Sequence, residues 1–172
     1  MRIAVFIDAA NMSYAQRSEH AGFGIDFNKF KTYLCQLDTP SDSFSAIYYV
    51  GKKMPVRLKD QKFLEALRHM GYKIHNKPMR TYIDPETGAE SEKANLDIEI
   101  ALDMLMHMNK YDKAYLCSGD GDFTRVIQYL IDHGKTVVVI TTWSMLSGDL
   151  YDACSEFIDL KDIRQHIERV LE

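Results

Sequence analysis

The stretch Arg2-Ile-Ala-Val-Phe-Ile7, followed at once by Asp8, decides the fold class of this 172-residue chain. After Arg2 it is a continuous apolar run rich in β-forming residues, which is typical of a strand buried on both faces of a parallel sheet. The charged Asp8 then stands where the strand leaves the sheet. We therefore expect residues 2–7 to form the first strand, in the centre of the sheet, with Asp8 at its carboxyl end.

Similar apolar runs recur at residues 45–50, 113–117 and 136–142, and residues 73–75 are a candidate for a further short strand. Stretches with helical spacing separate these runs, and this alternation indicates βαβ units with right-handed crossovers. The sequence therefore predicts an α/β protein built on a parallel sheet.

The predicted helices follow apolar residues at three and four spacing. One segment, residues 95–108, is apolar almost all round, so we expect that helix to be largely buried. The turn-forming sequence Asp84-Pro-Glu-Thr-Gly88 predicts an exposed hairpin or loop tip. Helical spacing is found at residues 27–37, 58–70, 95–108, 122–131, 145–154 and 161–171.

The composition is that of one folded globular domain, residues 1–172. Hydrophobic residues make up 46% of the chain and charged residues 27%, which excludes disordered and fibrous proteins. A membrane-spanning helix needs about 20 apolar residues, and the apolar runs here are shorter or broken by charge. Residues 3–7 are also too short for the core of a signal peptide. We therefore expect no membrane association and a cytoplasmic protein, with its three cysteines reduced and buried.

The net charge of −4 hides a basic segment. Between residues 51 and 80, nine Lys and Arg face two acidic residues, which gives +7 for this segment and leaves −11 for the rest. Such a segment can follow a phosphate backbone, and the alternative is a solvated helix face with a lysine-rich entry loop. The candidate nucleic-acid contacts are Lys52, Lys53, Arg57, Arg80 and Lys93.

Acidic residues follow two of the predicted strands. Asp8 follows the first, and Asp120 and Asp122 lie in Ser118-Gly-Asp-Gly-Asp-Phe123 after residues 113–117. Ligands of open α/β sheets bind at the carboxyl ends of the strands, and carboxylates that gather there repel one another unless a cation relieves the charge. An oxygen-only ligand set favours Mg²⁺ or Mn²⁺. Asp122 is alternatively a helix N-cap.

A third group of acids begins the predicted helix of residues 95–108. Asp97 can cap the helix or point into the acidic cleft, and we rank it as a ligand. Asp103 lies six residues on, about 240° round the helix, so it supports the site or the structure without touching the same ion. Glu99 shares a face with Asp103 and is a weak candidate.

Four motifs in order carry a resemblance to a known family. They are Asp8-x-x-Asn11, Lys93-x-Asn95-x-Asp97 with Asp103, Ser118-Gly-Asp-Gly-Asp-Phe123, and a tail from Leu146-Ser147 to Phe157-Ile158-Asp159-Leu160. Together they resemble the NYN domain, specifically the LabA-like branch of the PIN-like nuclease superfamily. The match runs from Arg2 to about Leu160. Ala94 departs from the glycine of many LabA-like sequences but removes no ligand.

The resemblance implies a three-layer α/β/α sandwich with a mainly parallel sheet and a metal-dependent ribonuclease site made of aspartates. Carried over by position, the metal ligands are Asp8, Asp97, Asp120 and Asp122. Asn11 and Ser118 support them through hydrogen bonds. Such a site uses Mg²⁺ or Mn²⁺ to activate water and to stabilise charge on an RNA phosphodiester. The implied partner is single-stranded or structured RNA, and the resemblance also allows a homodimer.

Two competing hypotheses remain to be weighed against the nuclease. The first keeps the fold without catalysis, as a LabA-like regulatory module that binds RNA or a protein partner, although the complete carboxylate set favours catalysis. The second is a phosphatase of the haloacid-dehalogenase type, which needs an aspartate two residues after the first one, where this chain has Ala10. The sequence also lacks the glycine-rich phosphate loops of the Walker and dinucleotide-binding types.

Overall fold

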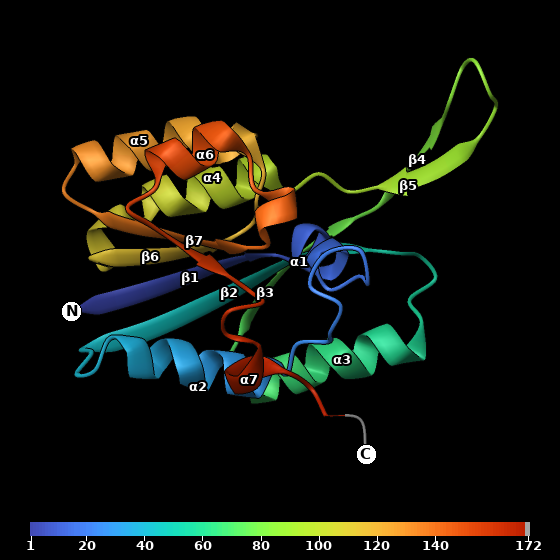
Figure 1. The fold of residues 1–172 in the computed structure, drawn as a ribbon. Helices are drawn as coiled ribbons and strands as arrows, with labels where there is room; N and C mark the ends of the chain where they lie inside the picture. Colours follow the sequence, from blue (N-terminus) through green and yellow to red (C-terminus); the bar gives the residue numbers. More distant parts are fainter. Residues whose placement is uncertain (171–172) are drawn as a thin grey trace.

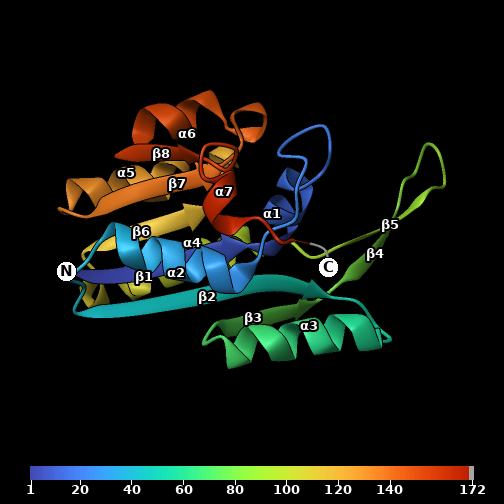
Figure 2. The ribbon, with the colours of Figure 1, turned by 60° about the horizontal axis from the view of Figure 1, so that its bottom comes forward.

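The computed structural model describes residues 1–170 and is built around a six-stranded parallel sheet with helices on both faces (Figures 1 and 2). The strand order is β3-β2-β1-β6-β7-β8. The predicted α/β class and parallel sheet are therefore confirmed. The strands are β1 Arg2–Asp8, β2 Ser43–Lys52, β3 Lys73–Pro78, β6 Lys113–Cys117, β7 Thr136–Thr141 and β8 Glu156–Asp159.

Strand β1 lies in the centre of the sheet, as its sequence predicts, between β2 and β6. Its side chains alternate between the two faces, as in any strand. Ile3, Val5 and Ile7 pack into one hydrophobic cluster, and Ala4 and Phe6 pack into the other. The run has no polar face because both of its faces are covered.

The helices divide between these two clusters. Those that pack into the cluster of Ile7 are α1 Ala9–Ala15, α2 Phe27–Leu37, α3 Leu58–His69 and α7 Arg164–Ile167. Those that pack into the cluster of Phe6 are α4 Asp97–Met106, α5 Thr124–Asp132 and α6 Gly148–Ala153. Figure 1 shows the two layers on opposite sides of the sheet. Three short 3₁₀ turns complete the chain, η1 Met108–Lys110, η2 Gly121–Phe123 and η3 Trp143–Met145.

The prediction that residues 95–108 are largely buried is wrong. Ile100 and Met104 are buried, but Ile98, Leu102 and Met106 are 70%, 50% and 71% exposed. The three exposed residues recur every four positions and so share one side of α4. The sheet covers the opposite side, and nothing else within residues 1–170 packs over the exposed side.

Two further expectations need correction. Of the cysteines, only Cys117 is buried, while Cys35 and Cys154 are half-buried; all three are free thiols. The helix expected over residues 161–171 is confined to α7, and Glu168 forms an isolated bridge with Ile25. Residue 171 lies outside the described residues.

A hairpin projects from the body of the molecule (Figure 1). It consists of β4 Arg80–Ile83 and β5 Glu90–Lys93, which pair antiparallel in a separate two-stranded sheet. The predicted turn forms its tip, where the Asp84 carboxylate accepts hydrogen bonds from two backbone amides and Gly88 takes a positive φ of 68°. Within residues 1–170, no helix combines the length and apolarity needed to cross a membrane.

Candidate metal centre

Asp8 ends β1 and caps α1, so one residue closes the strand and starts the helix. Its Oδ1 accepts a hydrogen bond from the Asn11 amide at 3.1 Å, and its Oδ2 accepts one from the Ser118 hydroxyl at 3.1 Å. Burial raises the pKa of this carboxyl above its usual range, and these hydrogen bonds oppose the shift. The side chain is therefore fixed at the carboxyl end of the central strand.

The second acidic segment follows β6, the neighbour of β1. Ser118 is fully buried and accepts a hydrogen bond from the Asp120 amide while it donates to Asp8. Asp120 in turn caps η2, because its Oδ1 accepts from the Asp122 amide at 3.0 Å. The N-cap alternative for Asp122 is therefore wrong: Asp120 caps the turn, and Asp122 lies inside it.

Position 119 requires glycine because the backbone of Met145 packs closely against it. A Cβ at this position would clash with the carbonyl oxygen of Met145, and the Gly119 carbonyl accepts a hydrogen bond from the Ser147 amide at 3.0 Å. The Asn11 side chain also accepts from the Gly119 amide at 3.1 Å. This space is thus filled by the segment after β7 and is not left open for a ligand.

Asp97 enters from the opposite layer, as the first residue of α4. Its amide donates to the Asn95 side chain at 2.8 Å, so Asn95 satisfies one backbone amide at the start of the helix. Burial raises the pKa of Asp97 to about 6, and the negative charges of Asp8 and Asp120 add to the shift. Burial is thus the main cause of the shift, and the neighbouring carboxylates add to it.

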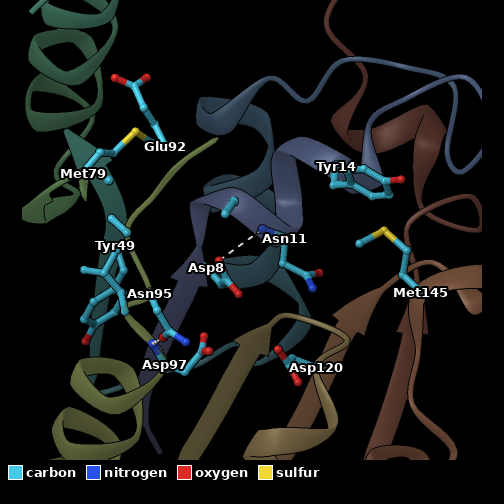
Figure 3. Close-up of a pocket in the computed structure, with 14 residues that line it drawn as sticks. Asp8, Asn11, Tyr14, Tyr49, Met79, Glu92, Asn95, Asp97, Asp120 and Met145 are labelled. Carbon is cyan, nitrogen blue, oxygen red and sulfur yellow. Dashed lines mark hydrogen bonds between the residues drawn. The ribbon is translucent and has the colours of Figure 1, made fainter. Parts of the chain in front are cut away.

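Three of the predicted ligands converge. One carboxylate oxygen each from Asp97, Asp120 and Asp122 lies within 4.8 Å of the other two. Asp8 is outside this trio but lines the same cavity of about 450 Å³ with Asp97 and Asp120 (Figure 3). The donors are all oxygens, so the arrangement fits a hard divalent cation such as Mg²⁺ or Mn²⁺.

The remaining acidic candidates lie beside the cavity. Asp103 accepts a hydrogen bond from the Tyr49 hydroxyl at 2.8 Å, and the His75 ring nitrogen is 3.7 Å from the same carboxylate oxygen. Because Tyr49 lines the cavity, Asp103 supports its wall from behind. Glu99 pairs with Lys77 at 2.6 Å, and this ion pair lowers the pKa of Glu99.

Two of the predicted nucleic-acid contacts share a groove next to the cavity. Lys53 and Arg57 line a depression of about 860 Å³, together with Arg17 from the segment after α1. Met79 and Glu92 line both the groove and the acidic cavity, so the two depressions are neighbours. The Lys53 ammonium pairs with the Glu92 carboxylate at 2.5 Å.

The other basic candidates are dispersed. Lys52 lines a neighbouring cavity with mainly apolar walls. Arg80, the first residue of β4, is exposed. The side chain of Lys93 lies outside the described part of the structure. The basic segment therefore contributes separate groups and does not form one continuous face.

Sequence reasoning missed several residues of the site, among them Tyr49, Met79 and Glu92 of the cavity wall and the three described next. Tyr14 and Met145 line the acidic cavity (Figure 3), and the Arg17 guanidinium lies 4.2 Å from the centre of the Tyr14 ring. Tyr14 and Arg17 follow the recognised Asp8-x-x-Asn11 motif by only a few positions, and the one local signal was their proximity to it. Met145 reaches the cavity through tertiary packing alone.

The burial of Asp97 beside other carboxylates predicts a pH-dependent stability of the metal-free protein. The folded state binds the Asp97 proton more tightly than the unfolded state, whose carboxyl keeps its usual pKa of 3.8. The free energy of unfolding therefore falls as the pH rises from about 4 through about 6. Asp97→Asn removes this loss. We expect it to raise the unfolding temperature in EDTA by about 2–4 °C near pH 8, with a much smaller gain near pH 4.5.

Thermal unfolding followed by circular dichroism at the two pH values checks this expectation. Asp132→Asn is the matched control, because Asp132 is exposed at the end of α5, at the opposite edge of the sheet. An Asp97→Asn gain that is equal at both pH values contradicts the assigned cause.

The fold and site define an α/β protein with an aspartate pocket suited to a divalent cation at the carboxyl edge of a parallel sheet. The NYN domain model matches residues 2–161, and the chain belongs to the NYN domain family. It is 37% identical to the "Low amplitude and bright protein LabA" of Synechococcus elongatus over 171 residues, which is 98% of this chain and 88% of that protein.

A solved structure supports the same fold. The crystal structure of a protein of unknown function from Vibrio parahaemolyticus superposes with a TM-score of 0.77 at 27% sequence identity. The similarity covers 96% of this chain and 95% of that one. The six-stranded sheet and its helical layers therefore belong to a shared architecture.

Proposed function

We propose that this NYN domain is a metal-dependent ribonuclease that hydrolyses RNA phosphodiester bonds. One observation carries the proposal: the carboxylates of Asp97, Asp120 and Asp122 converge, and two of them, Asp97 and Asp120, line a cavity together with Asp8. Carboxylates so close together are unfavourable without a cation, and a cation at that position faces an open cavity in which a phosphodiester can lie.

The residues divide the work as follows. Asp97, Asp120 and Asp122 hold Mg²⁺ or Mn²⁺, and Asp8 adds a fixed negative charge on the cavity wall. When bound, the ion supplies activation of water and neutralisation of charge on the phosphoryl group. Asn11 and Ser118 keep the two acidic segments in register, because each of them bridges the end of β1 and the segment after β6.

The groove with Arg17, Lys53 and Arg57 is the candidate track for the RNA backbone. It shares Met79 and Glu92 with the wall of the acidic cavity, so an RNA strand that lies in the groove runs beside the carboxylates. Because Lys53 already pairs with Glu92, binding of phosphate exchanges one ion pair for another. The groove is also lined by Asp60, Glu90 and Glu92, so its three basic side chains offer separate phosphate contacts within a surface of mixed charge.

The proposal predicts metal-dependent cleavage by the purified protein. The protein is stripped with EDTA and incubated with a pool of single-stranded and structured RNAs, with Mn²⁺, Mg²⁺ or no metal added. We expect cleavage only with metal. We also expect Mn²⁺ to raise the unfolding temperature, since an ion that binds only the folded state at about 100 times its Kd stabilises by about 2.7 kcal/mol.

Inert protein that nevertheless binds Mn²⁺ supports the regulatory module in place of the nuclease. Cleavage that persists in EDTA points to a contaminating ribonuclease and contradicts the proposed site.

A further inference from the structure

Three aromatic side chains form an exposed cluster beyond the acidic cavity. Trp143 is 60% exposed and Tyr151 is 47% exposed. The Trp143 ring stacks on Phe157, with centroids 5.1 Å apart and an interplanar angle of 18°, and meets Tyr151 edge-on at 5.0 Å. The three rings and two carboxylates, Asp159 and Asp162, line a hollow of about 420 Å³.

The indole is held firmly although most of it faces solvent. The Trp143 amide donates to the Asp159 carboxylate at 3.0 Å, and the parallel Phe157 ring covers part of the indole. Thr142 and Ser144, on either side of Trp143, are joined by a hydroxyl hydrogen bond of 3.2 Å, and Ser144 also bonds the His20 ring at 2.7 Å. The fold thus orients a large aromatic surface without burying it.

The same turn joins this cluster to the proposed catalytic cavity. Trp143 and Met145 are the first and last residues of η3, and Met145 lines the acidic cavity. The Met145 carbonyl lies against Gly119, and Ser147 bonds the Gly119 carbonyl, in the segment that carries Asp120. The indole is therefore carried by a residue two positions from one that lines the acidic cavity, on the same short turn.

The chemistry of the hollow selects a base over a phosphate. None of its five lining side chains is basic, and Asp159 and Asp162 repel a phosphate backbone. Aromatic rings stack on any nucleobase, and carboxylates accept hydrogen bonds from base N–H groups. Only an unpaired base offers its face and its edge together.

We propose that the Trp143 cluster is a stacking site for an unpaired base of single-stranded RNA, next to the scissile position. This inference rests on the proposed function and adds to it a substrate class: single-stranded in preference to duplex RNA. Trp143 is a positioning residue here, since it holds a base and does not touch the reacting phosphate.

Intrinsic fluorescence tests the proposal directly, because Trp143 is the single tryptophan of the chain. A single-stranded RNA of about 12 nucleotides, a length within known site sizes, is titrated into the wild-type protein in EDTA, which prevents metal-dependent cleavage. We expect the indole emission to be quenched by the single strand and much less by the duplex of the same sequence. Unchanged emission at RNA concentrations that saturate binding overturns the proposal, as does equal quenching by the duplex.

The second readout is the anisotropy of fluorescently labelled RNA, which measures RNA binding by the wild type and by variants. We expect Trp143→Ala to raise the Kd for the single strand by about 5- to 150-fold, and Trp143→Phe to retain most of the affinity. Tyr129→Ala is the matched control, because Tyr129 is also an exposed aromatic residue but stacks on His133 on the outer face of α5. An unchanged Kd for Trp143→Ala overturns the stacking site.

The outcomes separate this inference from the nuclease proposal. Wild-type protein that cleaves RNA with metal but shows neither quenching nor a Trp143→Ala effect keeps the proposed function and loses the stacking site. Wild-type protein that neither binds nor cleaves RNA loses both. The fluorescence titration needs no variant, so a destabilised Trp143→Ala leaves the test intact.

Discussion

Asp120→Asn is expected to lower the rate of metal-dependent RNA cleavage by about 10³-fold, which corresponds to about 4 kcal/mol of lost transition-state stabilisation at 1.36 kcal/mol per tenfold change. The substitution removes a negative charge from the trio of Asp97, Asp120 and Asp122. It keeps the side-chain oxygen that caps η2 through the Asp122 amide. We therefore attribute the expected loss to the charge and not to local unfolding.

Initial rates at several Mn²⁺ concentrations measure this effect, and calorimetric titration with Mn²⁺ measures the loss of affinity. Asp132→Asn serves again as the control, with an expected rate equal to that of the wild type. The metal-free Asp120→Asn protein is expected to unfold at the wild-type temperature or above it, because a repelling charge is gone. A variant that cleaves at the wild-type rate refutes the ligand assignment.

The largest expected loss of stability lies far from the site, at a buried ion pair. Asp38 follows α2, and its carboxylate accepts hydrogen bonds from the Lys113 ammonium at 2.9 Å and the Tyr115 hydroxyl at 2.5 Å. The side chains of Lys113 and Asp38 are only 13% and 9% exposed. Asp38→Ala leaves the Lys113 charge nearly buried without its partner, so we expect a loss of about 3–5 kcal/mol in the free energy of unfolding.

Urea denaturation measures this loss. Glu168→Ala is the matched control, because it breaks the Arg164–Glu168 pair, whose members are 54% and 35% exposed and whose expected contribution is about 0–1 kcal/mol. Lys113→Met in the Asp38→Ala background removes the unpaired charge and is expected to recover part of the stability. Equal losses for Asp38→Ala and Glu168→Ala contradict the burial argument.

The central sheet could be predicted from the sequence because each inner strand is a contiguous apolar run, as residues 3–7 and 137–140 are. The tip of the hairpin could be predicted from its turn residues, but strands β4 and β5 could not. Their residues are polar or exposed and pack against no core. Composition alone misled at α4, where Ile98 and Met106 are as apolar as their buried neighbours but face outward. Amino-acid type gives the hydrophobicity of a helix, whereas its burial depends on how many elements pack around it.

The acidic part of the candidate site could also be predicted, because Asp8 ends β1 and Asp120 lies three residues after the adjacent parallel strand β6. The rest of its wall could not. Met145 reaches the cavity because its backbone packs on Gly119, 26 positions earlier in the chain, and no local pattern marks that contact. No local pattern marks the exposure of the Trp143 side chain either, because it too depends on tertiary packing.

The strand order has a consequence for biosynthesis. Strand β1 emerges from the ribosome first, yet its pairing with β6 joins Ile3 to Lys113, about 110 residues later. At a synthesis rate of about 5–20 residues per second, one edge of this apolar strand remains unpaired for roughly 5–20 s until β6 is made. An unpaired strand edge is a template for association with other chains. The nascent N-terminal half, with β1, β2 and β3 already made, is thus the form of this protein most exposed to aggregation and the one for which chaperone binding matters most.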